Sequence, residues 1–254
     1  MLIDSHCHIH DLDYPIDAED VIVNAKESGV EQLICIGTDS ENSRQAIDFA
    51  NNHEDVFASV GVHPCKCESG LGKIAEILAE GNKKVVAVGE IGLDYHYGKG
   101  QRDSQIELLK QQIKLAIKYD LPIIFHVREA FDDFWPIIDE FINAGFKIRG
   151  VIHSFTDSPE NAAKAINYGF YIGINGFSTF IKNDVLKNMY ASLPLDKIIL
   201  ETDAPYLTPV PFRGKVNEPA FVRNIANFHA SIRQISVDKV ENITTATVRE
   251  LFNL

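Results

Sequence analysis

The segment Leu2-Ile3-Asp4-Ser5-His6-Cys7-His8 begins with an apolar run and ends with two histidines that are two residues apart. Residues two apart on a β-strand project from the same face, so we expect both imidazoles to point toward one place at the end of a strand. Neutral imidazoles bind zinc, manganese or iron well. A short His-X-His sequence also arises by chance in solvated loops. The interpretation as a metal site therefore depends on what the other strand ends offer.

The same pattern, an apolar β-rich run followed by a longer segment with helical spacing, repeats along the chain. It predicts strands at residues 2–6, 32–36, 57–62, 85–91, 122–127, 150–153, 170–174 and 197–201. It predicts helices at residues 17–28, 43–51, 72–80, 102–119, 131–144, 158–168, 183–192, 219–233 and 236–251. Strands that alternate with helices imply parallel pairing through right-handed crossovers. Eight such units predict an α/β fold, the closed (β/α)8 TIM barrel.

The main alternative to a barrel is an open doubly wound sheet. That fold usually has a glycine-rich phosphate-binding turn after its first strand. Here the first predicted strand ends in His6-Cys7-His8 instead. No linker or shift in composition divides residues 1–254, so we expect a single domain.

The charge of the chain limits the kinds of partner that it can bind. The 254 residues carry a formal net charge of -12. This argues against broad adhesion to nucleic acid, which depends on Lys and Arg replacing the counterions of the backbone. A phosphate substrate is still compatible, because bound metal ions supply a local positive field. Any contact with nucleic acid should therefore be confined and centred on metal ions.

Cysteine content and apolar runs indicate the compartment. Four cysteines, at positions 7, 35, 65 and 67, are unevenly placed, which favours reduced thiols in a cytoplasmic protein over a disulfide framework. Cys65-X-Cys67 has no second Cys or His pair nearby, so we do not expect it to bind metal. No basic segment followed by an apolar one begins the sequence, and no apolar run is as long as a membrane span. We expect a cytoplasmic location and no contact with membranes.

The later strand ends supply further histidines and carboxylates. Taken singly, each has a structural interpretation, such as a hydrogen-bonded core histidine, a salt-bridged carboxylate or a helix cap. Barrel enzymes place their chemistry at the C-terminal ends of the strands, and these side chains would converge there. The sequence thus predicts a metal site with six ligands: His6, His8, Glu90, His126, His153 and Asp203.

Six ligands are more than one tetrahedral zinc ion uses, and a mixed nitrogen and oxygen set with a central carboxylate suits two ions. We expect the first two histidines and Asp203 to hold one ion, the two later histidines to hold the other, and Glu90 to bridge them. Such ions lower the pKa of a bound water and polarise the electrophile. Asp203 is expected to orient that water or to accept its proton. Glu201, two residues earlier, should face the same way as a supporting residue or an added ligand.

Several motifs occur in a fixed order along the chain. They are Asp4-Ser5-His6-Cys7-His8, Gly61-Val62-His63-Pro64, Gly89-Glu90-Ile91-Gly92-Leu93-Asp94-Tyr95, Phe125-His126-Val127-Arg128-Glu129-Ala130, His153-Ser154-Phe155 and Glu201-Thr202-Asp203-Ala204-Pro205-Tyr206-Leu207. With these motifs the sequence resembles the TatD family of metal-dependent deoxyribonucleases, within the amidohydrolase-like metal hydrolases. Val216 and Asp157 depart from the pattern, where similar members often have a basic residue and a glycine.

The resemblance implies a TIM-barrel hydrolase whose metal ligands are the same six residues. It also implies two, or three, divalent cations, with magnesium, manganese or zinc all compatible. The implied reaction is hydrolysis of phosphodiester bonds in DNA from the 3′ end, so the expected partner is DNA, as single strands or 3′ ends. No obligate protein partner is expected.

Basic and aromatic residues near the predicted strand ends are candidates for binding such a substrate. Candidate phosphate contacts are His63, Arg128, Arg213 and Lys215, since Arg and Lys hold phosphate oxygens. Candidate stacking residues for unpaired bases are Tyr95, His96, Tyr97, Phe155, Phe177 and Phe180. Surface bases and barrel aromatics are also common without any ligand, and Trp135, inside a predicted helix, is expected to be core.

Two other functions stay open at this stage. One is a metal hydrolase that acts on an ester or amide bond, such as an aminoacyl-tRNA deacylase. The other is a catalytically silent scaffold that retains its metal for stability. The complete ligand set, with Glu90 and Asp203 present, argues against the scaffold, and the deoxyribonuclease is the preferred prediction.

Overall fold

A computed structural model describes residues 1–98 and 100–254 of the chain. In this part of the chain, eight strands form one sheet in the order β1 to β8, so neighbours in sequence are neighbours in the sheet. The strands are β1 (Leu2–Cys7), β2 (Val30–Ile36), β3 (Val56–Val60), β4 (Val85–Asp94), β5 (Ile123–Arg128), β6 (Gly150–Ile152), β7 (Tyr171–Ile174) and β8 (Ile198–Leu200). This is the strand order of a (β/α)8 barrel, and the predicted fold class is confirmed.

Helices connect the strands and end the chain. The α-helices are α1 (Ala18–Glu27), α2 (Ser40–Asn52), α3 (Ile74–Ala79), α4 (Arg102–Tyr119), α5 (Phe131–Asn143), α6 (Pro159–Asn167), α7 (Asp184–Ser192), α8 (Val222–Arg233) and α9 (Val237–Phe252). Short 3-10 helices are η1 (Pro64–Ser69), η2 (Gly176–Thr179), η3 (Leu195–Lys197) and η4 (Pro219–Phe221). In the described ranges no helix combines the length and the apolar character needed to cross a bilayer.

The chain divides into two compact units. Residues 1–35 and 154–254 form one, here the terminal unit, and residues 36–153 form the other, here the central unit. The expectation of a single domain stays a prediction.

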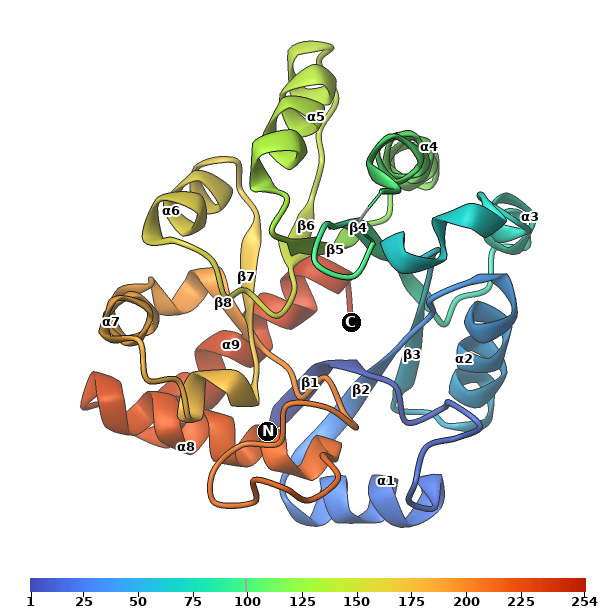
Figure 1. The fold of residues 1–254 in the computed structure, drawn as a ribbon. Helices are drawn as coiled ribbons and strands as arrows, with labels where there is room; N and C mark the ends of the chain where they lie inside the picture. Colours follow the sequence, from blue (N-terminus) through green and yellow to red (C-terminus); the bar gives the residue numbers. More distant parts are fainter. Residues whose placement is uncertain (99) are drawn as a thin grey trace. The chain divides into compact units, whose positions relative to one another are not determined.

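In the terminal unit, β1 and β2 pair in parallel, with Cys7 opposite Cys35. Strands β7 and β8 also pair in parallel. A parallel bridge joins Cys7 to Ala204, just after β8, so the first strand meets the segment that follows the last strand. Helix α9 packs on α8, β1 and β8 at the red end of the chain (Figure 1). The bridge within the sheet and the packing of α9 on both strands therefore hold the ends of β1 and β8 together.

In the central unit, β3, β4, β5 and β6 pair in parallel in that order. Helix α2 packs on β3, α4 packs on β4 and α5 packs on β5. Strand β4 is buried from Val86 to Asp94, as expected for a parallel strand covered on both faces. It extends beyond the predicted 85–91, because Gly92, Leu93 and Asp94 pair with His126, Val127 and Arg128 of β5.

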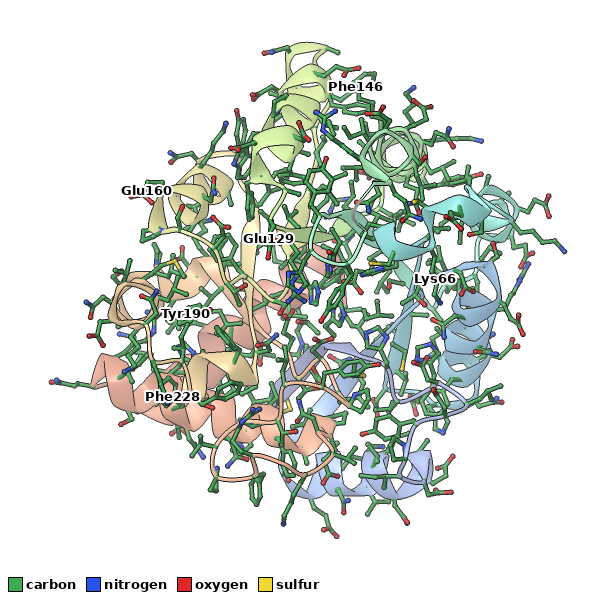
Figure 2. All side chains as sticks on the ribbon, viewed as in Figure 1. Lys66, Glu129, Phe146, Glu160, Tyr190 and Phe228 are labelled. Atoms are coloured by element: carbon green, nitrogen blue, oxygen red, sulfur yellow. The ribbon has the colours of Figure 1, made fainter. Side chains whose placement is uncertain are left out.

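Local sequence explains where many helices begin and which face they bury. The carboxylate of Asp39 caps α2 by accepting hydrogen bonds from the amides of Glu41 (2.9 Å) and Asn42 (2.8 Å). Helix α5 buries an aromatic face that includes Trp135, which confirms the prediction that this residue is core. Figure 2 labels Tyr190 of α7, which is buried and donates its hydroxyl hydrogen bond to the carbonyl of Phe155 at 2.6 Å.

His229 of α8 is a fully buried histidine, and we expect it to make the fold sensitive to acid. Its Nε2 lies 3.1 Å from Oγ of Ser178. Burial, together with the charge of Arg233, lowers the pKa of His229 from 6.5 to about 3. Below pH 6.5 this histidine becomes protonated in the unfolded chain but stays neutral in the folded chain. The stability present at neutral pH is therefore lost as the pH falls toward the pKa of the folded state.

We expect the free energy of unfolding to fall by about 1.4 kcal/mol per pH unit through this one group. His229→Gln should flatten the dependence between the two pKa values, as measured by urea unfolding across that interval. His53→Gln changes a partly exposed histidine at the end of α2 and serves as the control. Identical slopes for wild type and His229→Gln would contradict the assignment.

Candidate metal centre

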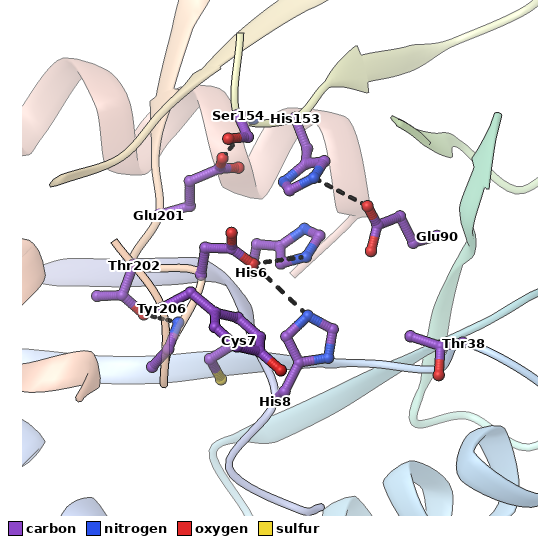
Figure 3. A network of polar contacts seen from close by, with 12 residues as sticks. His6, Cys7, His8, Thr38, Glu90, His153, Ser154, Glu201, Thr202 and Tyr206 are labelled. Atoms are coloured by element: carbon purple, nitrogen blue, oxygen red, sulfur yellow. Dashed lines mark hydrogen bonds and ion pairs between the residues drawn. The ribbon is translucent and has the colours of Figure 1, made fainter. Parts of the chain in front are cut away.

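The terminal unit brings three predicted ligands together. His6 lies in β1, His8 directly follows it, and Asp203 follows β8. The Nε2 atoms of His6 and His8 each lie 3.6 Å from the same oxygen, Oδ1 of Asp203. In Figure 3, dashed lines at the labelled rings of His6 and His8 mark the two contacts. Donor atoms bound at about 2.1 Å in a tetrahedron lie about 3.4 Å apart, so these separations fit one divalent ion. We refer to these residues as the terminal donor set.

Backbone hydrogen bonds fix the positions of the terminal donor set. The amide of Asp203 donates to the carbonyl of His6, and the amide of His8 donates to the carbonyl of Ala204, both at 2.8 Å. Asp203 has a φ of 59°, in the left-handed region, which costs most residues roughly 1–2 kcal/mol but which Asp and Asn visit more readily. The chain therefore holds this candidate ligand in an unusual conformation, and Asp is a residue type that suits this conformation.

Two other carboxyl groups of the terminal unit support this arrangement. Asp4 is fully buried, and it accepts hydrogen bonds from the amide of Thr202 (2.8 Å) and from the Thr202 hydroxyl. Burial raises the pKa of Asp4 to about 8, against the opposing effect of these hydrogen bonds. Oε1 of the buried Glu201 accepts the amide hydrogen of Ser154 at 2.6 Å, as in Figure 3. This contact fits the supporting role expected for Glu201, and its role as an added ligand stays a prediction.

The central unit gathers imidazoles around Glu90, which is 4% exposed on β4. Oε1 of Glu90 lies 2.6 Å from Nδ1 of His126 and 2.9 Å from Nε2 of His153; Figure 3 shows the second contact. Nε2 of His63 lies 3.7 Å from the same oxygen. Burial opposes ionisation of Glu90, but the surrounding imidazoles hold its pKa well below the ordinary value. We refer to Glu90, His126 and His153 as the central donor set.

Asp94, at the end of β4, is a site residue that the sequence analysis missed. Its Oδ2 lies 3.0 Å from Nε2 of His126, and its Oδ1 accepts the amide hydrogen of Tyr97 at 2.7 Å. Burial is the largest single influence and raises the pKa of Asp94, but the hydrogen bonds from His126 and from the amide of Tyr97, together with the nearby imidazoles, outweigh it and the pKa falls to about 2. A carboxylate on the second nitrogen fixes the orientation of a ligand ring. A carboxylate four residues after Glu90 at the same strand end was the available signal.

The donor types of both sets suit divalent cations, and in the central set both imidazoles lie at hydrogen-bond distance from Glu90. Each combines imidazole nitrogens with a carboxylate, the mixture that zinc, manganese and similar ions accept. The terminal donor set contains His6, His8 and Asp203, and the central one contains Glu90, His126 and His153. All six ligands predicted from the sequence thus lie in one of two clusters. The bridging role of Glu90 stays a prediction.

Three of the four predicted substrate contacts, Arg128, Arg213 and Lys215, are exposed side chains that lie over aromatic rings. In the terminal unit, the guanidinium of Arg213 lies 3.7 Å from the ring centre of Phe180, and Lys215 lies over Phe212 at 5.4 Å. In the central unit, Arg128 lies over Tyr97 at 4.7 Å. Their contact with substrate stays a prediction.

The aromatic predictions need one correction. Phe155 is 3% exposed, packed in the terminal unit, so the expectation that it stacks on a base is wrong. Tyr206, which the sequence analysis did not single out, is 61% exposed. Its ring lies edge-on to that of His8, with centroids 6.5 Å apart. Its place three residues after Asp203 was the signal that would have drawn attention to it.

A parallel eight-stranded barrel whose strand ends carry imidazole and carboxylate donor sets defines a metal-dependent hydrolase. Comparison with known proteins agrees with this class. Residues 3–253 match the family model described as TatD related DNase, and the chain belongs to this family.

Relatives and solved structures match nine tenths or more of the chain. The chain is 36% identical to a protein of Bacillus subtilis named uncharacterized metal-dependent hydrolase YabD, over 100% of both chains. It is 33% identical to a Schizosaccharomyces pombe protein named deoxyribonuclease Tat-D, covering 90% of this chain and 85% of that one. The crystal structure of YjjV, a TatD homologue from Escherichia coli, matches with a TM-score of 0.90 and 31% identity, covering 100% of this chain and 98% of that one.

Proposed function

We propose that this hydrolase is a deoxyribonuclease that cleaves phosphodiester bonds of DNA, from 3′ ends or in single strands. The proposal rests on the terminal donor set and on the contacts of Glu90 with His126 and His153, in a chain of the TatD-related family, one relative of which is named a deoxyribonuclease. We propose two divalent ions, or three, with magnesium, manganese or zinc compatible. When bound, such ions polarise a phosphate and lower the pKa of water.

The residues of the chain have separate tasks in this proposal. Asp203 orients the attacking water or accepts its proton, which is the work of a general base. Glu90 stays ionised among its imidazoles and keeps the central donor set anionic. Asp94 and Glu201 hold their neighbours in place through the contacts described above. A cytoplasmic location and the absence of an obligate protein partner stay predictions.

Arg213 is proposed to hold a phosphate of the substrate. Its guanidinium stacks on Phe180 and donates one hydrogen bond to the carbonyl of Thr208 at 3.1 Å. The stacked ring and the carbonyl orient the group while the side chain stays exposed, and Arg can hold phosphate oxygens with its remaining N–H groups.

Arg213→Ala is expected to raise KM for single-stranded DNA about tenfold and to change kcat little, because a contact made equally in ground and transition states affects binding alone. Steady-state kinetics in a fixed salt concentration measure both constants. Lys182→Ala, which removes a cation from the segment after η2, is the matched control. A fall in kcat with KM unchanged would place Arg213 at the transition state instead.

The substrate class is tested with chelator-stripped protein to which magnesium, manganese or zinc is returned. The substrates are 3′-labelled single-stranded DNA, an aminoacyl-tRNA and a panel of simple amides. Metal-dependent release of 3′ nucleotides supports the proposal and ranks the ions. Cleavage of an ester or amide with intact DNA would overturn it. Asp203→Asn, purified in parallel, reports any contaminating nuclease.

A further inference from the structure

The ring of His63 is oriented by the start of η1. His63 follows β3 and precedes Pro64, the first residue of η1. Its Nδ1 accepts the amide hydrogen of Cys65 at 3.1 Å. Its own amide donates to the carbonyl of Thr38 at 2.9 Å, and its carbonyl accepts from the amide of Lys66 at 2.8 Å. Both the backbone and one ring nitrogen are thus engaged.

This contact determines where the ring carries its proton. A nitrogen that accepts a hydrogen bond presents a lone pair and has no proton. A protonated imidazolium has N–H groups at both positions, so the accepting Nδ1 means that the ring is neutral. The one proton of a neutral imidazole then lies on Nε2. Nε2 is the nitrogen that faces Glu90.

The same contact conflicts with a role as metal ligand. By distance alone, His63 joins Glu90 and His126 in a group that could hold an ion. A metal-binding Nε2 would need the proton to move to Nδ1, where it would meet the amide hydrogen of Cys65. Metal-binding histidines almost always donate the other N–H to an acceptor. In His63 the group next to Nδ1 is the amide of Cys65, which is itself a hydrogen-bond donor.

His126 shows the opposite environment. Both of its ring nitrogens face carboxylate oxygens, Nδ1 at 2.6 Å from Glu90 and Nε2 at 3.0 Å from Asp94. The rings of His63 and His126 are neighbours, with centroids 4.5 Å apart. Two adjacent imidazoles in the central unit are therefore fitted for different tasks.

We infer that His63 is not a metal ligand and that its Nε2–H donates a hydrogen bond to a non-bridging oxygen of the substrate phosphate. The 3.7 Å separation from Glu90 is longer than a hydrogen bond, so that N–H has capacity for an incoming oxygen. The side chain is 18% exposed, so a ligand can reach it. A fixed neutral donor stabilises the charge that develops on phosphate oxygens during attack. The phosphate acceptor rests on the proposed function, whereas the tautomer and the absence of ligation do not.

The first experiment reads the tautomer directly. Protein labelled with ¹⁵N-histidine is examined by NMR without metal and after addition of zinc, and the His63 signals are assigned from their loss in His63→Gln. We expect a protonated Nε2 and an unprotonated Nδ1 in both states. Loss of the Nε2 proton on addition of zinc would overturn the inference.

The second experiment separates metal binding from phosphate binding. Calorimetry with magnesium should give the same affinity, within a factor of about three, for wild type and His63→Ala, and a much lower one for His126→Ala. Inorganic phosphate should bind magnesium-loaded His63→Ala about tenfold more weakly than wild type. His63→Gln, which keeps an N–H donor, should restore part of this affinity, and His53→Gln should change nothing.

Loss of magnesium binding in His63→Ala, or unchanged phosphate affinity, would overturn the inference. These measurements need no turnover, so they test the inference about His63 independently of the proposed function. Protein that fails to cut DNA but shows the expected NMR signature and phosphate affinities would refute the deoxyribonuclease and leave His63 as a phosphate donor.

Discussion

Asp203→Asn is expected to lower kcat/KM for DNA cleavage by at least about 10³-fold, because general-base catalysis alone contributes about 10²–10⁴ and the change also removes an anionic ligand. The variant should remain folded, since this residue lies beyond the end of β8 and outside the packed layers. Asn is preferred to Ala for the test, because Asn also tolerates the left-handed conformation at this position. Thermal melting of both proteins and steady-state kinetics with added metal are the measurements.

The matched control for this prediction is Asp13→Ala. Asp13 is an exposed carboxylate in the segment after β1, so its removal changes the net charge by the same amount. Near-normal turnover of Asp203→Asn in metal-replete buffer would refute the assigned role. Lost turnover with a melting temperature far below that of wild type would show a folding defect instead.

Glu90→Gln is expected to reduce turnover to background and to weaken metal binding by the central unit. The substitution preserves size, but it replaces a buried anion among imidazoles by a neutral amide. A cation held there would lose its charged oxygen ligand, and the desolvation of the cation would no longer be compensated. Calorimetric titration with magnesium or zinc, beside kinetics, measures both effects.

Glu129→Gln is the control for Glu90→Gln. Glu129 is an exposed carboxylate of the central unit whose Oε1 lies 2.7 Å from Nδ1 of His96. The substitution makes the same change, from carboxylate to amide, next to an imidazole at the surface. Unaltered metal affinity and turnover in Glu90→Gln would remove Glu90 from the mechanism.

The sequence predicted the order and type of the elements because hydrophobic periodicity reports burial directly. Helix α4 has the predicted bounds, Arg102–Tyr119, where an apolar face repeats over five turns. The extension of β4 to Asp94 was missed, because its last residues are ordered by pairing with β5 and not by local preference. The helix η1 was also missed, since a short turn that His63 caps gives little periodic signal.

The clustering of the candidate ligands was predictable because strand ends of a barrel are identifiable from sequence, and imidazole or carboxylate there is uncommon in a packed layer. The hydrogen-bond partner of each of these side chains was not predictable from the sequence. The contact of Asp94 with His126 depends on the side-chain conformations of both residues, and that of Cys65 with His63 depends on the path of the loop. Periodicity contains no information about either, so the tautomer of His63 required a structure.

The main-chain hydrogen bonds between residues 6–8 and 203–204 have a consequence for protein engineering. They set the spacing of three candidate ligand positions through atoms that no side-chain substitution removes. Exchanging an imidazole for a carboxylate at position 6 or 8 would favour magnesium or manganese over zinc without shifting the positions themselves. We therefore expect that metal selectivity can be changed in this protein without loss of the scaffold.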